Sequence, residues 1–222
     1  MYRDLVAKHF SGCETVLFAP FASHDHDDYI SRMQDFLGPS GPRLVGIQEM
    51  DHSGGWPKAS GIYVGGGNSF LLVHELHKRD LVQRIRDSVL DGMPYLGVSA
   101  GANVASPTMM TTNDMPICLP PSFDSFGIVP FQVNPHYHPG KIRFMDGDEL
   151  ADHYGESRAQ RIAEYHRTSD TPVLGMWEGS FVKWDGSKGS LIGRATAFRR
   201  GEESFELSDC SGFNPYIEKI SE

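Results

Sequence analysis

The run from Pro94 to Asn103 leads a short apolar stretch into Ser99, which stands between Gly97 and Gly101. A serine on a sharp turn from strand to helix needs such small neighbours, because the strained backbone leaves no room for a β-carbon and a substrate must reach the hydroxyl. The turn would also aim the amide of Ala100 outward at a helix N-terminus, where partial positive charge stabilises an oxyanion. We therefore expect Ser99 to be a nucleophile and Ala100 to be an oxyanion donor.

A serine hydroxyl becomes a good nucleophile only when an imidazole takes its proton and a carboxylate orients that imidazole. Of the ten histidines, His136 alone directly follows a predicted apolar strand, with Pro135 restricting the backbone before it. Two carboxylates could serve as the acid. Glu178 ends a later strand, whereas Asp114 gives the chain order Ser, Asp, His of the α/β-hydrolases. The residues alone leave both open.

The glycines at 65, 66 and 67 end another predicted strand and precede Asn68. A strand end made of glycine lets backbone amides approach a ligand closely, so Gly67 could supply a second oxyanion donor beside Ala100. The alternative is a tight turn before a helix. A phosphate-binding loop is excluded, because the lysine and hydroxyl residue that should follow the glycines are missing.

Short apolar strands alternate with amphipathic helices along the chain, as in a mostly parallel sheet with helices on both faces. The pattern predicts strands at residues 15–21, 44–49, 61–64, 95–98 and 127–133, helices at 27–37, 69–90 and 159–166, and a C-terminal β meander from residue 173. We expect one α/β hydrolytic domain over residues 1–222. Functional groups of such folds gather beyond the carboxyl ends of the strands, where the glycines, Ser99, His136 and Glu178 all stand.

The formal net charge of −9 argues against binding to nucleic acid or to an anionic membrane surface. The sequence holds no apolar run long enough to span a bilayer, and its N-terminus lacks the apolar core of a secretion signal, so we expect a cytoplasmic protein. Cys13, Cys118 and Cys210 are odd in number and widely spaced, which favours buried, reduced thiols.

Alternating histidines and carboxylates at 24–28, and the pair His136 and His138, could in principle chelate a metal. We favour no metal and no cofactor. The first run lies at a predicted helix start, where aspartates cap the helix, and the second is better used for a catalytic base.

Together, these motifs resemble peptidase E, the cytoplasmic aspartyl dipeptidase family of serine peptidases, whose flavodoxin-like fold is related to that of the class I glutamine amidotransferases. The resemblance covers residues 15 to about 198 in the order of the family, and it is carried by residues 64–70, 97–103, Pro107 with 111–117, 134–137, 155–162, and Gly175 with 178–179. It implies that Ser99 is the nucleophile, His136 the general base and Glu178 the acid that orients the histidine.

The resemblance also implies cleavage after an N-terminal aspartate in short acidic peptides. Arg158 stands at the arginine position of the family and would hold the aspartate side chain through a bidentate contact. Asn68 and Asp114 would hold the rest of the aspartyl unit. The alternative for Arg158 is a surface ion pair with Glu156 or Glu164. We expect a peptide substrate, with no nucleic acid and no membrane as partners and a homodimer as the assembly to test.

Two departures from the family accompany the resemblance. The chain opens near a helix at Tyr2, where members of the family have an additional strand, and the loop from His138 to Tyr154 is longer than usual. The longer loop points to a lid or to altered specificity.

Three other functions remain open. One is a relative of cyanophycinase acting on β-aspartyl peptides, although Asn68 stands where that group has Gln or Asp. A second is a small serine esterase, which Asp114 as the acid would favour. The third is a catalytically silent protein that binds acidic peptides.

Overall fold

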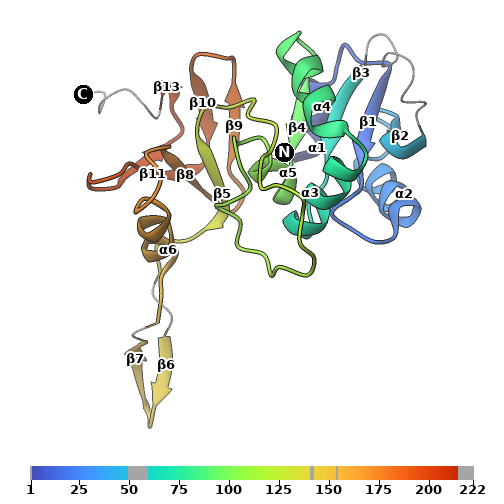
Figure 1. The fold of residues 1–222 in the computed structure, drawn as a ribbon. Coiled ribbons are helices and arrows are strands. Elements are labelled where there is room, and N and C mark those ends of the chain that lie inside the picture. The colour runs from blue at the N-terminus through green and yellow to red at the C-terminus, as the bar shows by residue number, and fades with distance from the viewer. Residues whose placement is uncertain (1, 50–59, 141–142, 154, 215–222) are drawn as a thin grey trace. The chain divides into compact units, whose positions relative to one another are not determined.

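Figure 1 shows the computed structural model, which describes residues 2–49, 60–140, 143–153 and 155–214. The chain forms two compact units, residues 1–128 and 129–222. Buried apolar clusters lie within each unit. Our expectation of a single domain stays a prediction.

The first unit is built on a parallel sheet with the strand order β2-β1-β3-β4. Its strands are β1 (Thr15–Ala19), β2 (Leu44–Gly46), β3 (Ser60–Val64) and β4 (Tyr95–Gly97), and a short 3-10 helix η1 (Ile47–Glu49) follows β2. These positions confirm the first four predicted strands, except that residues 47–49, predicted as part of the second strand, form η1. Because the strands are parallel, the ends of β3 and β4 lie side by side, with Val64 paired to Gly97. The glycine turn and Ser99 follow these two neighbouring ends.

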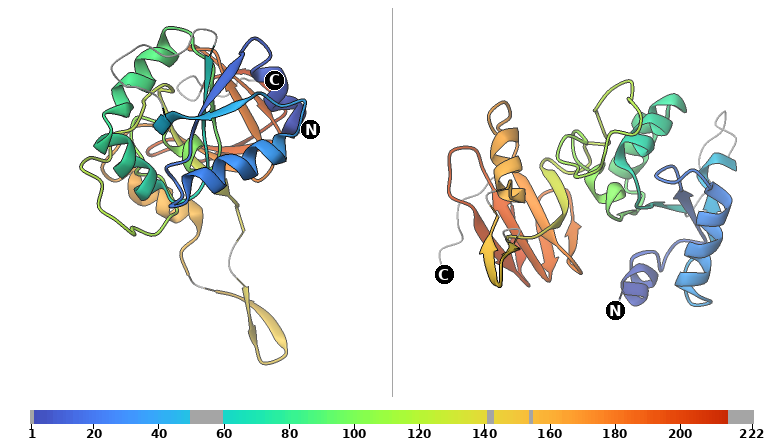
Figure 2. Two further views of the ribbon diagram at one scale, coloured as in Figure 1. Left: turned by 90° about the vertical axis from the view of Figure 1, so that its right-hand side faces the viewer. Right: turned by 90° about the horizontal axis from the view of Figure 1, so that it is seen from below.

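Helices cover both faces of this sheet, as predicted. The helices are α1 (Tyr2–His9), α2 (His26–Leu37), α3 (Ser69–Lys78), α4 (Leu81–Leu90) and the short α5 (Ala100–Asn103). Alternate residues of a strand point to opposite faces. Val16 and Phe18 therefore pack with α1 and α2, whereas Leu17 and Ala19 pack with α3 to α5. Figure 2 (right) shows the blue helices and the green helices on opposite sides of the strands.

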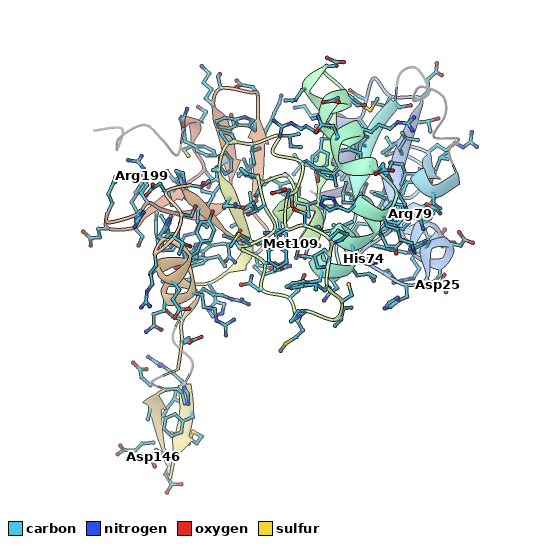
Figure 3. All side chains as sticks on the ribbon, viewed as in Figure 1. Asp25, His74, Arg79, Met109, Asp146 and Arg199 are labelled. Atoms are coloured by element: carbon cyan, nitrogen blue, oxygen red, sulfur yellow. The ribbon has the colours of Figure 1, made fainter. Side chains whose placement is uncertain are left out.

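The helix predicted over residues 69–90 is two helices, α3 and α4. Asp80 lies between them in the left-handed conformation, with φ of 55°. Buried Leu76 and Leu81 are five residues apart, so one continuous helix would turn Leu81 away from the apolar face. The break brings both leucines into one core cluster. Arg79, labelled in Figure 3, lies over the Phe21 ring at 4.8 Å.

The second unit contains a mixed sheet with the order β12-β11-β8-β5 and a smaller sheet with the order β13-β10-β9. The strands are β5 (Gln132–Tyr137), β8 (Val173–Trp177), β9 (Phe181–Trp184), β10 (Gly189–Ile192), β11 (Arg194–Phe198), β12 (Phe205–Ser208) and β13 (Ser211–Phe213). Helix α6 (Arg158–Tyr165) packs on the mixed sheet through Ile162 against Tyr137, Val173 and Phe198. The predicted helix near 159–166 and the C-terminal meander are thus confirmed.

One predicted strand begins later than expected. β5 starts at Gln132 rather than Gly127. The amides of Phe126, Gly127 and Ile128 donate to carbonyls of residues 104–106, which takes this segment out of strand pairing. The strand then continues through His136 instead of ending before it.

The long loop after His138 contains a two-stranded hairpin of β6 (Arg143–Asp146) and β7 (Glu149–Asp152). Residues 141, 142 and 154 of this loop lie outside the described residues. Gly147, with φ of +64°, opens the two-residue turn at its tip. Asp146, labelled in Figure 3, pairs there with Glu149, so that the hairpin ends in acidic side chains.

The three cysteines are free thiols, but each is half-buried rather than buried as predicted. Partial burial raises the pKa of each thiol. Within the described residues, no helix is both long and apolar enough to cross a bilayer.

Candidate active site

Ser99 occupies a strained turn between β4 and α5, as the sequence predicts for a nucleophile. Its φ of 54° and ψ of −110° lie outside the regions that side-chain-bearing residues normally adopt. Such a conformation costs about 1 to 3 kcal/mol and persists only where the surrounding structure imposes it, which is typical of functional sites. Ala100 is the first residue of α5, at the position predicted for an oxyanion donor.

The flanking glycines allow the backbone to pack tightly at this turn. A Cβ built on Gly97 would lie 2.3 Å from the carbonyl oxygen of Gly101, and one on Gly101 would lie 2.2 Å from that of Val64. Both contacts are with backbone, which has little freedom to move away. In addition, the Tyr95 hydroxyl donates a 2.6 Å hydrogen bond to the Gly101 carbonyl. The strand, the turn and the first turn of α5 therefore support one another.

We expect Gly101→Ala to lower the free energy of unfolding by about 1 to 3 kcal/mol, the usual cost of an overpacked site. Urea denaturation monitored by circular dichroism would measure it. Gly12→Ala is the matched control, because a Cβ at Gly12 meets no heavy atom within 4 Å. We expect the control to change stability by less than about 0.5 kcal/mol. Equal losses in both variants would contradict the packing argument.

The glycine turn after β3 lies against the nucleophile. A Cβ on Gly66 would come within 3.0 Å of the Ser99 Cβ and 3.6 Å of its Oγ. Gly67 is exposed, has φ of +134°, and packs so closely on Ala22 that a Cβ would lie 2.3 Å from the Ala22 carbonyl oxygen. Tyr29 donates a 3.0 Å hydrogen bond to the Gly66 carbonyl. A side chain at either glycine would obstruct the surface beside Ser99.

Asn68 and Asp114, predicted to bind substrate, both make contacts within the protein. The Asn68 Oδ1 caps α3 by accepting from the amides of Phe70 and Leu71, and its Nδ2 donates to the Met115 carbonyl at 2.9 Å. The Asp114 Oδ2 accepts from both the amide and the hydroxyl of Ser69. Their roles toward a substrate stay predictions.

His136 and Glu178 are in direct contact, with 2.6 Å between Nδ1 and Oε2. The carboxylate accepts, so Nδ1 carries the proton and Nε2 keeps the lone pair that a general base requires. The two side chains are 51% and 81% exposed. Exposed pairs of this kind contribute little to the stability of a fold. The contact is the one that the prediction of Glu178 as the orienting acid requires.

Strand pairing creates this contact. β5 and β8 are parallel neighbours, and Tyr137 pairs with Trp177 where the two strands end. The register shifts between Asn134 and Tyr137, and His136 adopts a left-handed φ of 55° within that irregularity. Its strained backbone is a second outlier at a predicted functional residue.

Arg158 is the first residue of α6, directly after the capping residue Ser157. A cation at a helix N-terminus is disfavoured by the helix dipole, so helix stability does not explain an arginine there. Glu156 pairs with Arg161 at 3.3 Å. Both the substrate-binding role of Arg158 and its alternative, an ion pair with Glu156 or Glu164, stay predictions.

Some residues that support these positions were missed from the sequence. Tyr29 and Tyr95 hold the two turns through their hydroxyls, and Ser69 and Thr112 bond with Asp114. Ser69 follows the capping asparagine and Thr112 stands in a polar run, which are signals that could have been used. The tyrosines carried no such signal, because their partners are backbone carbonyls 37 and 6 residues away.

The run at residues 24–28 serves the start of α2. Asp25, labelled in Figure 3, accepts from the Asp28 amide at 3.0 Å as the N-cap, and Asp28 pairs with Arg32. Among the described residues, no three histidine, cysteine or acidic side chains come together as a metal site would require.

Comparison with known proteins identifies the family. The profile of peptidase family S51 matches residues 2–192. The chain belongs to peptidase family S51. Three relatives illustrate the similarity within it. Peptidase E of Streptomyces coelicolor is 42% identical over 198 residues, covering 86% of this chain and 77% of the relative. A probable alpha-aspartyl dipeptidase of Drosophila melanogaster is 41% identical over 210 residues, covering 93% and 85%. Peptidase E of Shewanella oneidensis is 44% identical over 186 residues, covering 82% and 75%.

Two solved structures share the fold of this S51 peptidase. A protein described as a peptidase E from Listeria monocytogenes has a TM-score of 0.52 at 22% identity, covering 93% of this chain and 94% of its own. A peptidase from an acI-B1 Actinobacterium has a TM-score of 0.60 at 16% identity, covering 95% and 91%. The predicted α/β fold and membership in this family of peptidases are confirmed.

Proposed function

We propose that this S51 peptidase is an aspartyl dipeptidase that cleaves the bond after an N-terminal aspartate by way of an acyl-enzyme on Ser99. The strained turn that presents Ser99 carries the proposal, because it is the conformation in which a serine acts as a nucleophile. The names of the relatives, peptidase E and alpha-aspartyl dipeptidase, support the substrate class.

In the proposed reaction, His136 Nε2 removes the Ser99 proton while Oγ attacks the carbonyl carbon of the aspartyl residue. The resulting oxyanion accepts hydrogen bonds from the amides of Gly67 and Ala100. His136 then gives its proton to the leaving amine as the C–N bond breaks. Water, activated by the same histidine, hydrolyses the ester, and Glu178 stabilises the imidazolium in both halves.

Recognition of aspartate is proposed to rest on Arg158. Its guanidinium offers two parallel donors to a carboxylate, which gives both charge and geometry. The protein has a net charge of −9, so an acidic peptide gains no long-range attraction, and recognition depends on such a local cation. Asn68 is the proposed neighbour of the rest of the aspartyl unit. The same role, expected for Asp114 from the sequence, is weighed below against its contacts with Ser69.

We expect Arg158→Ala to lower kcat/KM for Asp-Leu. The corresponding activation free energy should rise by about 2 to 5 kcal/mol, the loss when one partner of a charge-assisted pair is removed. Ala-Leu should change little, because it lacks the carboxylate. Steady-state kinetics on both dipeptides would measure the difference. Arg161→Ala, on the same helix and paired with Glu156, is the matched control. An equal drop on both dipeptides would mean that Arg158 supports the fold rather than reads aspartate.

A panel of dipeptides starting with Asp, isoAsp, Glu and Ala tests the activity itself. We expect cleavage of Asp-Leu far above that of Ala-Leu. Preference for the isoAsp peptide would instead indicate a β-aspartyl hydrolase related to cyanophycinase. Cleavage of p-nitrophenyl esters without peptides would indicate an esterase, and binding without turnover a silent acidic-peptide receptor.

A cytoplasmic location is the other part of this proposal. The three free cysteines support it, because free thiols persist in a reducing compartment. Cell fractionation with an antibody to the protein would test the location, and sedimentation of the purified protein would test for a homodimer.

A further inference from the structure

The carboxylate of Asp114 lies at the start of helix α3. Its Oδ2 accepts a 2.7 Å hydrogen bond from the Ser69 amide and a 2.6 Å bond from the Ser69 hydroxyl. Thr112 Oγ1 donates to the Ser69 Oγ at 2.9 Å and accepts from the Asp114 amide at 3.2 Å. Ser69 is buried, and Thr112 and Asp114 are half-buried.

A second contact runs alongside the first. The Asn68 side chain donates to the carbonyl of Met115, the residue after Asp114, while its oxygen caps α3. Four hydrogen bonds thus join residues 112–115 to residues 68–69. A fifth, from the Asp114 amide to Thr112, lies within the loop. We call Thr112, Asp114, Ser69 and Asn68 the clamp.

The clamp adjoins the part of the structure that most needs external support. Residues 65–67 are all glycine, so the turn has no side chains of its own to anchor it. Its backbone is held before the clamp by the Gly65 amide on Ala19 and by Tyr29 on Gly66. After Gly67, the first anchors are Asn68 and Ser69, two residues of the clamp.

The negative charge of Asp114 is favourable at the start of α3. The N-terminus of α3 carries partial positive charge, and the first turn of the helix contains no acidic residue of its own. Asp114 supplies that charge from a residue 45 positions away in the chain. The first turn of α3 therefore has its acidic partner in a separate loop. Next to Gly67, the Asn68 amide also donates to the Ala22 carbonyl at 3.0 Å.

We propose that Asp114 is a positioning residue, which acts through Ser69 to hold the Gly67 amide where an oxyanion forms beside Ser99. This inference rests on the proposed function. It differs from both roles that the sequence suggested for Asp114, which are the acid of the catalytic triad and a ligand of the aspartyl unit of the substrate. Each of the three roles predicts a different kinetic change.

The test compares Asp114→Ala, Asp114→Asn and Ser69→Ala with wild type on Asp-Leu. A displaced donor costs up to about 100-fold in rate, so we expect Asp114→Ala to lower kcat by about 10- to 100-fold with KM nearly unchanged. Ser69→Ala should lower kcat in the same way but less, because the Ser69 amide remains. Asp114→Asn, which keeps one acceptor oxygen, should be intermediate. The double variant Asp114→Ala/Ser69→Ala should lose no more kcat than Asp114→Ala alone, since both substitutions disrupt the same hydrogen-bond network.

Binding of a transition-state analogue separates positioning from a general structural effect. An aspartyl aldehyde forms a tetrahedral adduct with the serine and presents an oxyanion. We expect the affinity of each variant for this aldehyde to fall in proportion to its kcat. Binding of the product aspartate, which presents no oxyanion of this kind, should stay the same. Asp124→Asn is the matched control, because Asp124 is exposed and its carboxylate accepts from Ser122 in the same loop.

Three results would overturn the proposal. A rise in KM without a fall in kcat would make Asp114 a substrate ligand. A fall in kcat together with a changed pH profile would make it the partner of the histidine. Wild-type kinetics for Ser69→Ala would show that the contact is not used. Thermal melting of each variant identifies any that fail to fold, and Ser69→Ala keeps the test open if Asp114→Ala is one of them.

Failure of the proposed function would look different. If wild type cleaves no Asp dipeptide, the rate at which a fluorophosphonate labels Ser99 replaces kcat, because phosphonylation also forms an oxyanion and needs no aspartate. Slower labelling of Asp114→Ala would then still support the clamp, and an unchanged rate would contradict it.

Discussion

Ser99→Ala is expected to reduce kcat for Asp-Leu by about 10⁴-fold or more, leaving only the contribution of the oxyanion donors and of binding. The hydroxyl is the atom that forms the acyl-enzyme, so its loss removes the covalent pathway. Ser99 is half-buried and contributes little packing, so the fold should remain. Alanine keeps the β-carbon that the turn already accommodates.

The measurement is a stopped assay of Asp-Leu hydrolysis, with fluorophosphonate labelling as an independent readout. Ser106→Ala, a buried serine of the same segment, is the control for a general effect of removing a hydroxyl. We expect Ser106→Ala to be labelled and Ser99→Ala to be unlabelled. Near-normal turnover by folded Ser99→Ala would end the serine-peptidase proposal.

Glu178→Gln is expected to lower kcat by about 10⁴-fold, as happens when the acid of a serine triad becomes an amide. The amide can donate to His136 Nδ1, which would place the proton on Nε2 and block proton removal from Ser99. It also offers no charge to the imidazolium that forms. KM should change much less, because the carboxylate contacts the histidine and not the substrate in the proposed reaction.

Glu202→Gln is the matched control, since Glu202 is also an exposed carboxylate and its side chain pairs with Arg199 rather than with His136. Its kinetics should equal those of wild type. If Glu178→Gln retained full kcat while Asp114→Asn lost it with a changed pH profile, the acid role would pass to Asp114.

Local sequence was sufficient for the features that depend on neighbouring residues. The turn at Ser99 could be predicted because glycines two residues away on each side are needed for its backbone to pack, and the structure shows backbone carbonyls where their side chains would be. The glycine turn and the N-cap at Asp25 could be predicted for the same reason, because each depends on residues within a few positions. Short apolar runs located the parallel strands, since buried strands require continuous apolar side chains.

Features set by distant residues could not be decided in this way. The break at Asp80 depends on which leucines reach the shared core, and the late start of β5 depends on carbonyls of residues 104–106 that take up its preceding amides. Likewise, half-burial of the cysteines depends on what packs around them. In each case, contacts with residues far along the chain decide the local structure.

The two candidate acids show the division most clearly. The sequence offered Glu178 because it ends a predicted strand, and Asp114 because it gives the chain order Ser, Asp, His. Tertiary structure placed Glu178 against His136, because parallel pairing of β5 and β8 brings together residues 42 positions apart. It placed Asp114 against Ser69, across 45 positions, at the start of a helix whose first turn has no acidic residue. A hydrogen bond between side chains depends on their separation in space, and strand pairing and helix placement set that separation.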